Sequence, residues 1–271
     1  MQTRHLDRQT YFNESANTAR NYYIGYVETF IHLSRETRVL EVGCGEGGNL
    51  LPFAEKGCRV TGIDCVDCRI AQARKFFSAT EYDSDFRAVN FFDMPTGDRY
   101  DLILIHDVIE HIEDKTSFLR HLKLFLAQEG IVFWGFPAWQ MPFGGHQQIC
   151  HGKIAPVLPF IHLLPNFLYS GLLSILGEKV CIKELLETKR CGISIEHFEK
   201  LVTENGFQIA HRQLWFINPH YEQKFRLQPR KLASCISKMK YFRNFCATSC
   251  FYITRSVDGD ILYSSINSSA K

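Results

Sequence analysis

The most restrictive feature of the sequence is the stretch VLEVGCGEGGNL, which spans residues 39–50. It predicts a buried strand, a tight glycine turn and the first turn of a helix. Gly43, Gly45 and Gly48 satisfy the pattern G-x-G-x-x-G, in which glycine lets the backbone approach a ligand at the carboxyl end of the strand. Backbone N–H groups at the helix start would face the negative end of that ligand. The pattern also serves dinucleotides, so by itself it leaves the ligand open.

Strand and helix patterns alternate from residue 38 onward. Short apolar runs without internal proline predict strands that are covered on both faces. The clearest helical pattern between them is residues 116–126, where Phe118, Leu122 and Phe125 fall on one stripe. The alternation predicts an α/β, Rossmann-like, doubly wound and mostly parallel sheet in a three-layer αβα arrangement. The first five predicted strands are residues 38–42, 59–63, 86–91, 100–105 and 130–136.

The alternation stops after Pro137, where an apolar insertion begins. Residues 138–193 contain no clear strand, and residues 154–177 contain no Asp, Glu, Lys or Arg. This run is long enough to span a bilayer, but three prolines interrupt it. We therefore expect two or three short helices that form a helical lid over an acceptor pocket. A surface that dips into one face of a membrane is the alternative.

The length of 271 residues suits one α/β domain that carries an insertion. After the insertion, Ser194 is expected to cap a helix, and strands at 207–216 and 247–255 would complete a seven-stranded sheet. The predicted single domain 1–271 has five parts: an N-terminal helical cap (1–37), a cofactor-binding core (38–137), the apolar lid between strands five and six (138–193), the C-terminal completion of the sheet (194–255) and a polar tail (256–271).

Charge and cysteine usage exclude several classes of protein. The net charge of +2 does not suggest a nucleic-acid binder. The ten cysteines are expected to be reduced, because the chain starts with polar residues and no apolar signal segment, which favours a cytoplasmic protein. Cys65 and Cys68 form one C-x-x-C, but no second pair at zinc spacing follows, so incidental packing is favoured.

Acidic residues are expected at the ends of the next two strands. Asp64 ends the second predicted strand, about 20 residues after the glycine turn, where a carboxylate accepts two ribose hydroxyls. Asp93 is expected to end the third strand, where it would meet the exocyclic amine of an adenine, with Met94 against the ring. These positions favour an adenosine moiety.

With Asp64 and Asp93 at these positions after the glycine turn, the chain resembles the class I S-adenosylmethionine-dependent methyltransferases, in particular the small-molecule group called type 11 or type 12. The resemblance covers residues 38–136 and, less closely, 194–255. Residues 41–47 resemble the first motif of that family, and residues 107–112, DVIEHI, resemble its signature after strand four. The resemblance implies S-adenosylmethionine as cofactor. The expected cofactor-binding residues are Glu41, Gly43, Cys44, Gly45, Asp64, Cys65, Asp93, Met94 and His106.

Histidines on the expected loops are the candidate catalytic residues. Methyl transfer from a sulfonium is an in-line displacement in which the enzyme mainly positions the reactants. A hydroxyl acceptor also needs a base, and histidine titrates near neutral pH. His146 lies in a glycine-rich polar turn of the apolar insertion, and His111 follows strand four. A loop histidine that braces the lid is the alternative interpretation of His146.

A divalent metal is a further hypothesis for the same loops. Asp107, Glu110 and His111 form D-x-x-E-H, with His146 available from the next loop. This resembles the metal arrangement of small-RNA 3′-end methyltransferases and some quinone O-methyltransferases, where the first residue is usually Glu. The resemblance implies Mg²⁺ or Mn²⁺. The shorter Asp arm, and the wide occurrence of E-H-I in relatives that work without metal, favour a site without metal.

Basic residues after the insertion indicate which chemical class of methyl acceptor to expect. Residues 223–257 contain no Asp or Glu but eight Lys and Arg residues. Together with the apolar insertion, they predict an anionic or lipid-like acceptor and peripheral contact with anionic headgroups. We expect O-methylation of a hydrophobic small molecule. The alternatives are a non-catalytic, membrane-associated or subunit-binding module and a NAD-dependent oxidoreductase. The acceptor atom and the oligomeric state stay open.

Overall fold

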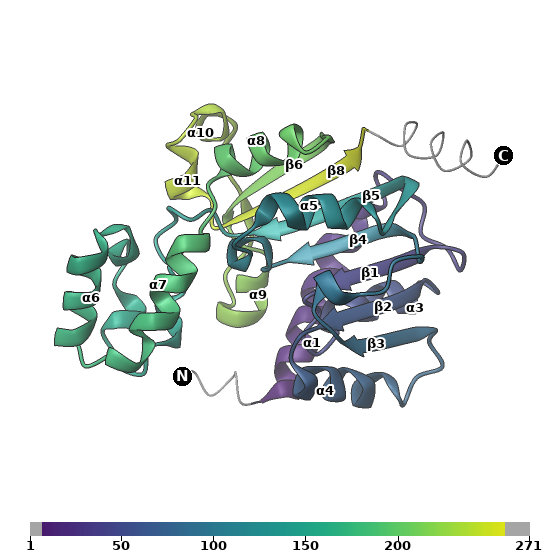
Figure 1. Ribbon diagram of the computed structural model, residues 1–271, viewed down its shortest axis with the longest axis horizontal. Coiled ribbons are helices and arrows are strands. Elements are labelled where there is room, and N and C mark those ends of the chain that lie inside the picture. Colours follow the sequence, from purple (N-terminus) through teal and green to yellow (C-terminus); the bar gives the residue numbers. More distant parts are fainter. Residues whose placement is uncertain (1–6, 258–271) are drawn as a thin grey trace.

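The computed structural model describes residues 7–257. An eight-stranded sheet forms its centre, in the order β3-β2-β1-β4-β5-β8-β6-β7, and helices cover both faces of this sheet (Figure 1). The first five strands are parallel, and β8 joins β5 antiparallel. The strands are β1 Arg38–Val42, β2 Arg59–Asp64, β3 Ser84–Ala88, β4 Tyr100–His106, β5 Leu126–Phe136, β6 Phe207–Ile217, β7 Arg230–Lys231 and β8 Ser249–Ser256.

The predicted α/β Rossmann-like class is confirmed, although the number of strands and several strand boundaries differ from the prediction. The sheet has eight strands rather than seven because the two-residue β7 pairs with β6 at the edge. The third strand ends at Ala88, not at residue 91. Asn90 causes this early end, since its Oδ1 accepts a hydrogen bond from the Phe92 N–H at 3.0 Å and starts a 3₁₀ turn, Phe91–Asp93.

The core lies in two layers, one on each face of the sheet. In β4, Ile103 and Ile105 belong to one buried cluster, whereas Leu102 and Leu104 belong to the other. This alternation explains why the strands are apolar throughout rather than at every second residue. The helices are α1 Arg8–Thr18, α2 Ile24–Val27, α3 Leu51–Glu55, α4 Asp67–Phe77, α5 Lys115–Lys123, α6 Asn166–Ile175, α7 Ile182–Cys191, α8 Ile195–Glu204, α9 His220–Phe225, α10 Ser234–Lys238 and α11 Arg243–Cys246.

The insertion between β5 and β6 forms a helical lobe beside the carboxyl ends of the strands (Figure 1). It contains α6, α7 and several 3₁₀ turns around a small core of its own. The insertion thus contains short helices, as its sequence predicts, but α6 and α7 project to one side of the sheet. Among the described residues, no helix has the length and apolar character needed to cross a membrane.

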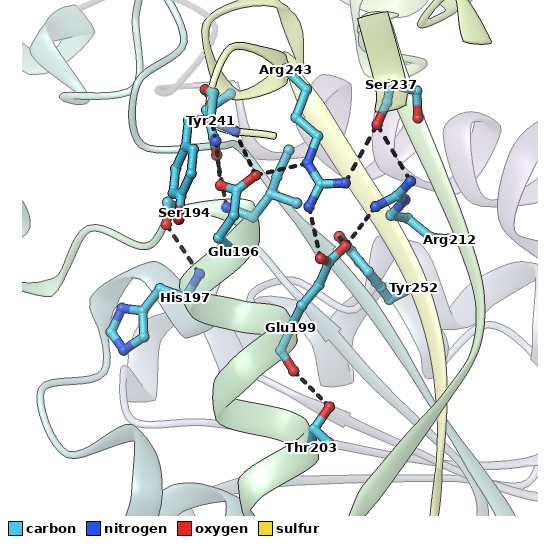
Figure 2. Close-up of polar contacts among 12 residues, drawn as sticks. Ser194, Glu196, His197, Glu199, Thr203, Arg212, Ser237, Tyr241, Arg243 and Tyr252 are labelled. Carbon is cyan, nitrogen blue, oxygen red and sulfur yellow. Dashed lines mark hydrogen bonds and ion pairs between the residues drawn. The ribbon is translucent and has the colours of Figure 1, made fainter. Parts of the chain in front are cut away.

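Helix α8 anchors the C-terminal part of the sheet. Ser194 caps it as predicted, because its Oγ accepts a hydrogen bond from the His197 N–H at 3.1 Å. Figure 2 shows two acids of this helix, Glu196 and Glu199, both bound to Arg243, whose side chain is only 4% exposed. Arg212 of β6 also binds Glu199, at 2.7 Å. These contacts hold the segment between β7 and β8 against the rest of the fold. Of the predicted cap and tail, residues 1–6 and 258–271 lie outside the described residues.

Candidate active site

The glycine turn after β1 has the backbone geometry that its sequence predicts. Gly43 and Gly45 have φ values of +71° and +53°, a region that residues with a side chain rarely adopt. A Cβ on Gly43 would also lie 2.5 Å from Cγ2 of Val108. The Gly45 N–H donates to Oδ2 of Asp64 at 3.0 Å, so the turn is tied to the end of β2.

Two cavities flank this turn at the carboxyl ends of the strands. The larger strand-end cavity, about 340 Å³, lies beside Asp64 and Cys65 and extends to Asn90. The smaller strand-end cavity, about 100 Å³, contains Cys44, Gly45 and His106. Both are lined by Gly43, Arg69 and Asp107. Helix α1 contributes Tyr11 and Ser15 to the smaller cavity, a contribution that the sequence alone did not indicate.

Asp64 is placed to hold both a backbone turn and a ligand. The residue is only 7% exposed and lies at the end of β2. Its Oδ2 accepts from Gly45 and its Oδ1 accepts from the Val66 N–H at 2.9 Å. Each carboxylate oxygen has a further lone pair. The two oxygens can therefore accept a pair of vicinal hydroxyls while the backbone bonds fix their orientation.

Asp93 and Met94 are not where the sequence analysis expected them. Asp93 is exposed and does not line the larger strand-end cavity. Met94 is 2% exposed and belongs to one of the two buried core clusters, and it lines neither strand-end cavity. The 3₁₀ turn that begins at Asn90 shifts both residues away. The structure instead brings Asn90, Phe91 and Phe92 to the cavity wall.

Glu41 contacts the smaller strand-end cavity only indirectly, through Asn49. Its Oε1 accepts a hydrogen bond from Nδ2 of Asn49, which lines the smaller strand-end cavity, at 2.7 Å. The other oxygen, Oε2, is buried without a partner. Burial, with a smaller contribution from the charge of Asp64, raises the pKa of Glu41 to about 8 against the opposing effect of the Asn49 bond. Glu41 thus positions Asn49 rather than lining a described cavity itself.

Asp107 lies where the cavities meet. It lines both strand-end cavities and a third cavity described below. Its φ of +53° is unusual for a residue with a side chain, and its Oδ2 lies 3.3 Å from Nδ1 of His106. The other ring nitrogen of His106 is 2.8 Å from the Tyr23 hydroxyl. The sequence analysis named Asp107 only as a metal candidate, because its central position depends on how separate loops pack.

The third cavity, about 480 Å³, is mainly apolar and we call it the acceptor-side cavity. Its volume is in the range of pockets for small organic ligands. The start of the insertion forms one wall and the α9 region forms the other. The lining residues are Asp107, Pro137, Met141, Phe143, His146, Gln148, Pro156, Val157, Asn218, His220, Tyr221, Lys224, Phe225, Leu227 and Thr248. Helices α6 and α7 contribute none of them.

His146 and His111 lie close together but line different cavities. Their ring centroids are 4.8 Å apart, and His111 faces the larger strand-end cavity while His146 faces the acceptor-side cavity. Burial, with a smaller contribution from the neighbouring His111, lowers the pKa of His146 to about 4. Burial also lowers the pKa of His111. At neutral pH, His146 is therefore uncharged and can accept a proton.

The same loops contain donors that fit a divalent metal. One ligand atom from each of Glu110, His111 and His146 lies within 4.8 Å of the other two, but Asp107 does not complete this set. Both carboxylate oxygens of Glu110 are buried and have no hydrogen-bond partner. Burial, together with the charge of Asp107, raises the pKa of Glu110 well above its usual value. An unpartnered carboxylate beside two imidazoles is a suitable donor set for a metal ion.

Residues 16–212 match a family model described as a methyltransferase domain. Among curated proteins, a ubiquinone biosynthesis O-methyltransferase of Nitrobacter winogradskyi is 33% identical over 95 residues, which cover 35% of this chain and 36% of that protein. The corresponding protein of Rhodopseudomonas palustris (strain TIE-1) is also 33% identical over 95 residues, 38% of its length. The chain thus spans little more than a third of the length of these relatives.

Solved structures with a similar fold are more distant in sequence. A putative sarcosine dimethylglycine methyltransferase from Galdieria sulphuraria has a TM-score of 0.57 at 13% identity, covering 88% of this chain and 85% of that one. The magnesium protoporphyrin IX methyltransferase of Synechocystis PCC 6803, solved with bound SAH, has a TM-score of 0.52 at 15% identity, covering 89% and 82%. At sequence identities of 13% and 15%, this similarity shows a shared fold and nothing more specific.

Proposed function

The chain belongs to the methyltransferase-domain family, and we propose that it transfers a methyl group from S-adenosylmethionine to an oxygen of a hydrophobic small molecule. One observation carries this proposal: Asp107 lines two strand-end cavities and also the apolar acceptor-side cavity. A donor in the first two would therefore meet an acceptor in the third. The O-methyltransferase relatives and the SAH-bound neighbour support the same reaction.

The strand-end cavities suit the two halves of the cofactor. Asp64 would hold the ribose hydroxyls in the larger cavity, and Asn90 would face the adenine edge in place of the expected Asp93. The amino-acid half would enter the smaller cavity, where Asn49 and the backbone around Gly45 supply hydrogen bonds. When bound, the cofactor supplies an electrophilic methyl group on sulfur. The protein's contribution is to align that methyl with the acceptor and to exclude competing water.

On the acceptor side, the chain has to remove a hydroxyl proton. His146 is the residue that we propose for this step, because it lines the acceptor-side cavity and is uncharged at neutral pH. In a second arrangement, Glu110, His111 and His146 would hold a divalent cation that lowers the pKa of the hydroxyl. The unpartnered oxygens of Glu110 are the observation that favours this arrangement.

The mouth of the acceptor-side cavity fits contact with an anionic membrane surface. Three of its lining residues are large, apolar and exposed: Val157 at 65%, Phe225 at 49% and Leu227 at 46%. Lys224 lines the same cavity, Arg226 lies within the same segment, and residues 223–257 contain no acid to oppose them. We propose that this rim rests on anionic headgroups, so that a lipid-like acceptor enters from the bilayer.

Cofactor binding is tested by thermal denaturation with S-adenosylhomocysteine. We expect a higher melting temperature of the wild-type protein at saturating ligand, and no shift for Asp64→Ala, because the ribose contacts are lost. Asp85→Ala on the neighbouring strand is the matched control, since that carboxylate is exposed and pairs with Arg87 instead. Absence of a shift in the wild type, or a shift with NAD(H) in its place, would overturn the proposal.

A further inference from the structure

The helical lobe of the insertion contains a second group of metal-binding side chains. Cys150 follows the 3₁₀ turn Gln147–Ile149, and Cys181 ends the turn Lys179–Cys181 that Glu178 precedes. All three are buried, at 2%, 5% and 3% exposure for Cys150, Cys181 and Glu178. One ligand atom from each lies within 4.8 Å of the other two. None of the three lines the strand-end or acceptor-side cavities.

The chain around Cys150 wraps closely about Glu178. The carboxylate accepts hydrogen bonds from the His151 N–H at 2.9 Å and from the Gly152 N–H at 2.6 Å. A Cβ at Gly152 would lie 2.6 Å from Glu178 Oε1, so a larger residue would disturb this contact. Each carboxylate oxygen still has a lone pair that points elsewhere.

His151 supplies a fourth donor at the same place. Its Nδ1 lies 4.0 Å from Sγ of Cys181, and its side chain is exposed. Two cysteines, one histidine and one carboxylate are ligand types that zinc accepts in tetrahedral sites. A zinc–sulfur distance of about 2.3 Å places two sulfur ligands about 3.8 Å apart. The ligand atoms of Cys150, Glu178 and Cys181 therefore have to approach one another by about 1 Å, and the exposed side chain of His151 has to turn toward them to complete the set.

We propose that Cys150, His151, Glu178 and Cys181 bind a structural Zn²⁺ ion within this lobe. Binding releases the thiol protons to solvent, because thiolates are the sulfur ligands. With four protein ligands the coordination sphere is closed, as in structural rather than catalytic zinc sites.

The small core of the lobe is consistent with such a crosslink. Apart from Cys150 and Cys181, this core contains five buried apolar residues with half-buried side chains packed around them, and the longest helices of the lobe have ten residues each. Cores of this size supply little stability, and small units often depend on a metal or a disulfide. Two of the proposed ligands, Cys150 and His151, also lie in the chain between Gln148 and Pro156, which line the acceptor-side cavity. Zinc would therefore fix the loop that forms one wall of that cavity.

The experiment measures the zinc content of the full-length protein by inductively coupled plasma mass spectrometry after purification under reducing conditions. We expect about one zinc per chain in the wild type and in Cys191→Ser, which alters a half-buried cysteine of α7. Cys150→Ser and Cys181→Ser should lose the metal. Glu110→Gln should retain it, which separates this site from the histidine pair of the active site.

Two further measurements do not depend on the folding of the cysteine variants. Removal of zinc with a chelator should lower the melting temperature of the wild type by about 5 °C, and added ZnCl₂ should restore it. His151→Ala alters an exposed side chain, so it should leave the metal-free protein unchanged but weaken zinc binding at least tenfold in chelator competition. Metal-free wild type that gains no stability with ZnCl₂ would overturn the proposal. So would a mass 2 Da below the reduced value, assigned to a Cys150–Cys181 disulfide.

Discussion

At the scale of single residues, His146 and Asp107 connect the cofactor side of the site to the acceptor side. Both have positive φ values, +56° and +53°, in a region that costs residues with a side chain about 1 kcal/mol or more. The glycines around His146 allow that conformation, since Gly144 and Gly145 pack against Trp139 and His162 without room for a Cβ. Backbone strain at two residues that line the same cavity is typical of functional positions.

The lowered pKa of His146 predicts the pH dependence of the reaction. The base must be uncharged, and its uncharged form persists down to a pH of about 4 because burial disfavours the charged ring. We therefore expect kcat to stay nearly constant from pH 8 to pH 5, whereas a base with an ordinary histidine pKa would lose half of its activity near pH 6.5. His146→Gln should lower kcat about 100-fold or more.

The control for this prediction separates the base from the metal arrangement. If His146 acts alone, adding Mg²⁺ or Mn²⁺ after EDTA treatment and desalting should not change kcat, whatever effect the loss of zinc from the lobe has. S-adenosylhomocysteine binding reports whether the fold survives at each pH. A large loss with EDTA that Mg²⁺ or Mn²⁺ restores, shared by Glu110→Gln, would contradict the simple base and favour the cation.

Residues of the cofactor site could be predicted where one local pattern fixes them. Gly43, Gly45 and Asp64 lie in or beside strands with clear boundaries, so their place at the strand ends followed from the sequence. The position of Asp93 could not be predicted in this way, because the hydrogen bond from the Phe92 N–H to Asn90 ends the third strand early. No periodicity in the sequence indicates this early end. Tyr11 could not be placed at all, since only the packing of α1 over the glycine turn brings it to the site.

At the scale of elements, helix α8 and the segment 233–246 depend on each other. Arg243 bridges Glu196 and Glu199 in an almost fully buried position, and the Tyr241 N–H also donates to Glu196. Sequence periodicity predicted the helix and its Ser194 cap, but it did not predict these contacts. They join positions more than 40 residues apart. The insertion is a second case in which the sequence predicted the elements but not their packing. Its composition predicted short helices, but it did not predict that these helices lie to one side of the sheet.

Arg243→Met should therefore lower the free energy of unfolding by about 3 kcal/mol, because it leaves two partly buried carboxylates without their shared cation. Urea denaturation measures this change. Lys200→Met is the matched control, since Lys200 forms an exposed pair with Glu204 at 3.7 Å, and its loss should change the free energy of unfolding by less than about 0.5 kcal/mol. Equal effects of the two variants would show that the buried bridge is not a main source of stability.

At the scale of the whole molecule, apolar side chains are exposed in several segments, and two of these segments differ clearly in charge. One is the rim of the acceptor-side cavity, where Phe225 and Leu227 lie beside Lys224 in a segment without acids. The other is helix α6, where Phe167 is 74% exposed and Ile175 is 85% exposed. Charge distinguishes them, because α6 has no basic residue of its own. A membrane with anionic headgroups should therefore bind the rim of the acceptor-side cavity rather than helix α6.

Flotation with lipid vesicles tests this selection. The wild-type protein should float with vesicles that contain anionic phosphatidylglycerol and much less with neutral phosphatidylcholine, and added salt should weaken the binding because headgroup attraction is screened. Phe225→Ser combined with Leu227→Ser should reduce the bound fraction about tenfold. Phe167→Ser combined with Ile175→Ser removes more exposed apolar surface than the rim pair and should still leave the bound fraction unchanged. If the α6 pair abolishes flotation while the rim pair does not, the membrane contacts the lobe, and acceptors would enter the cavity from solution.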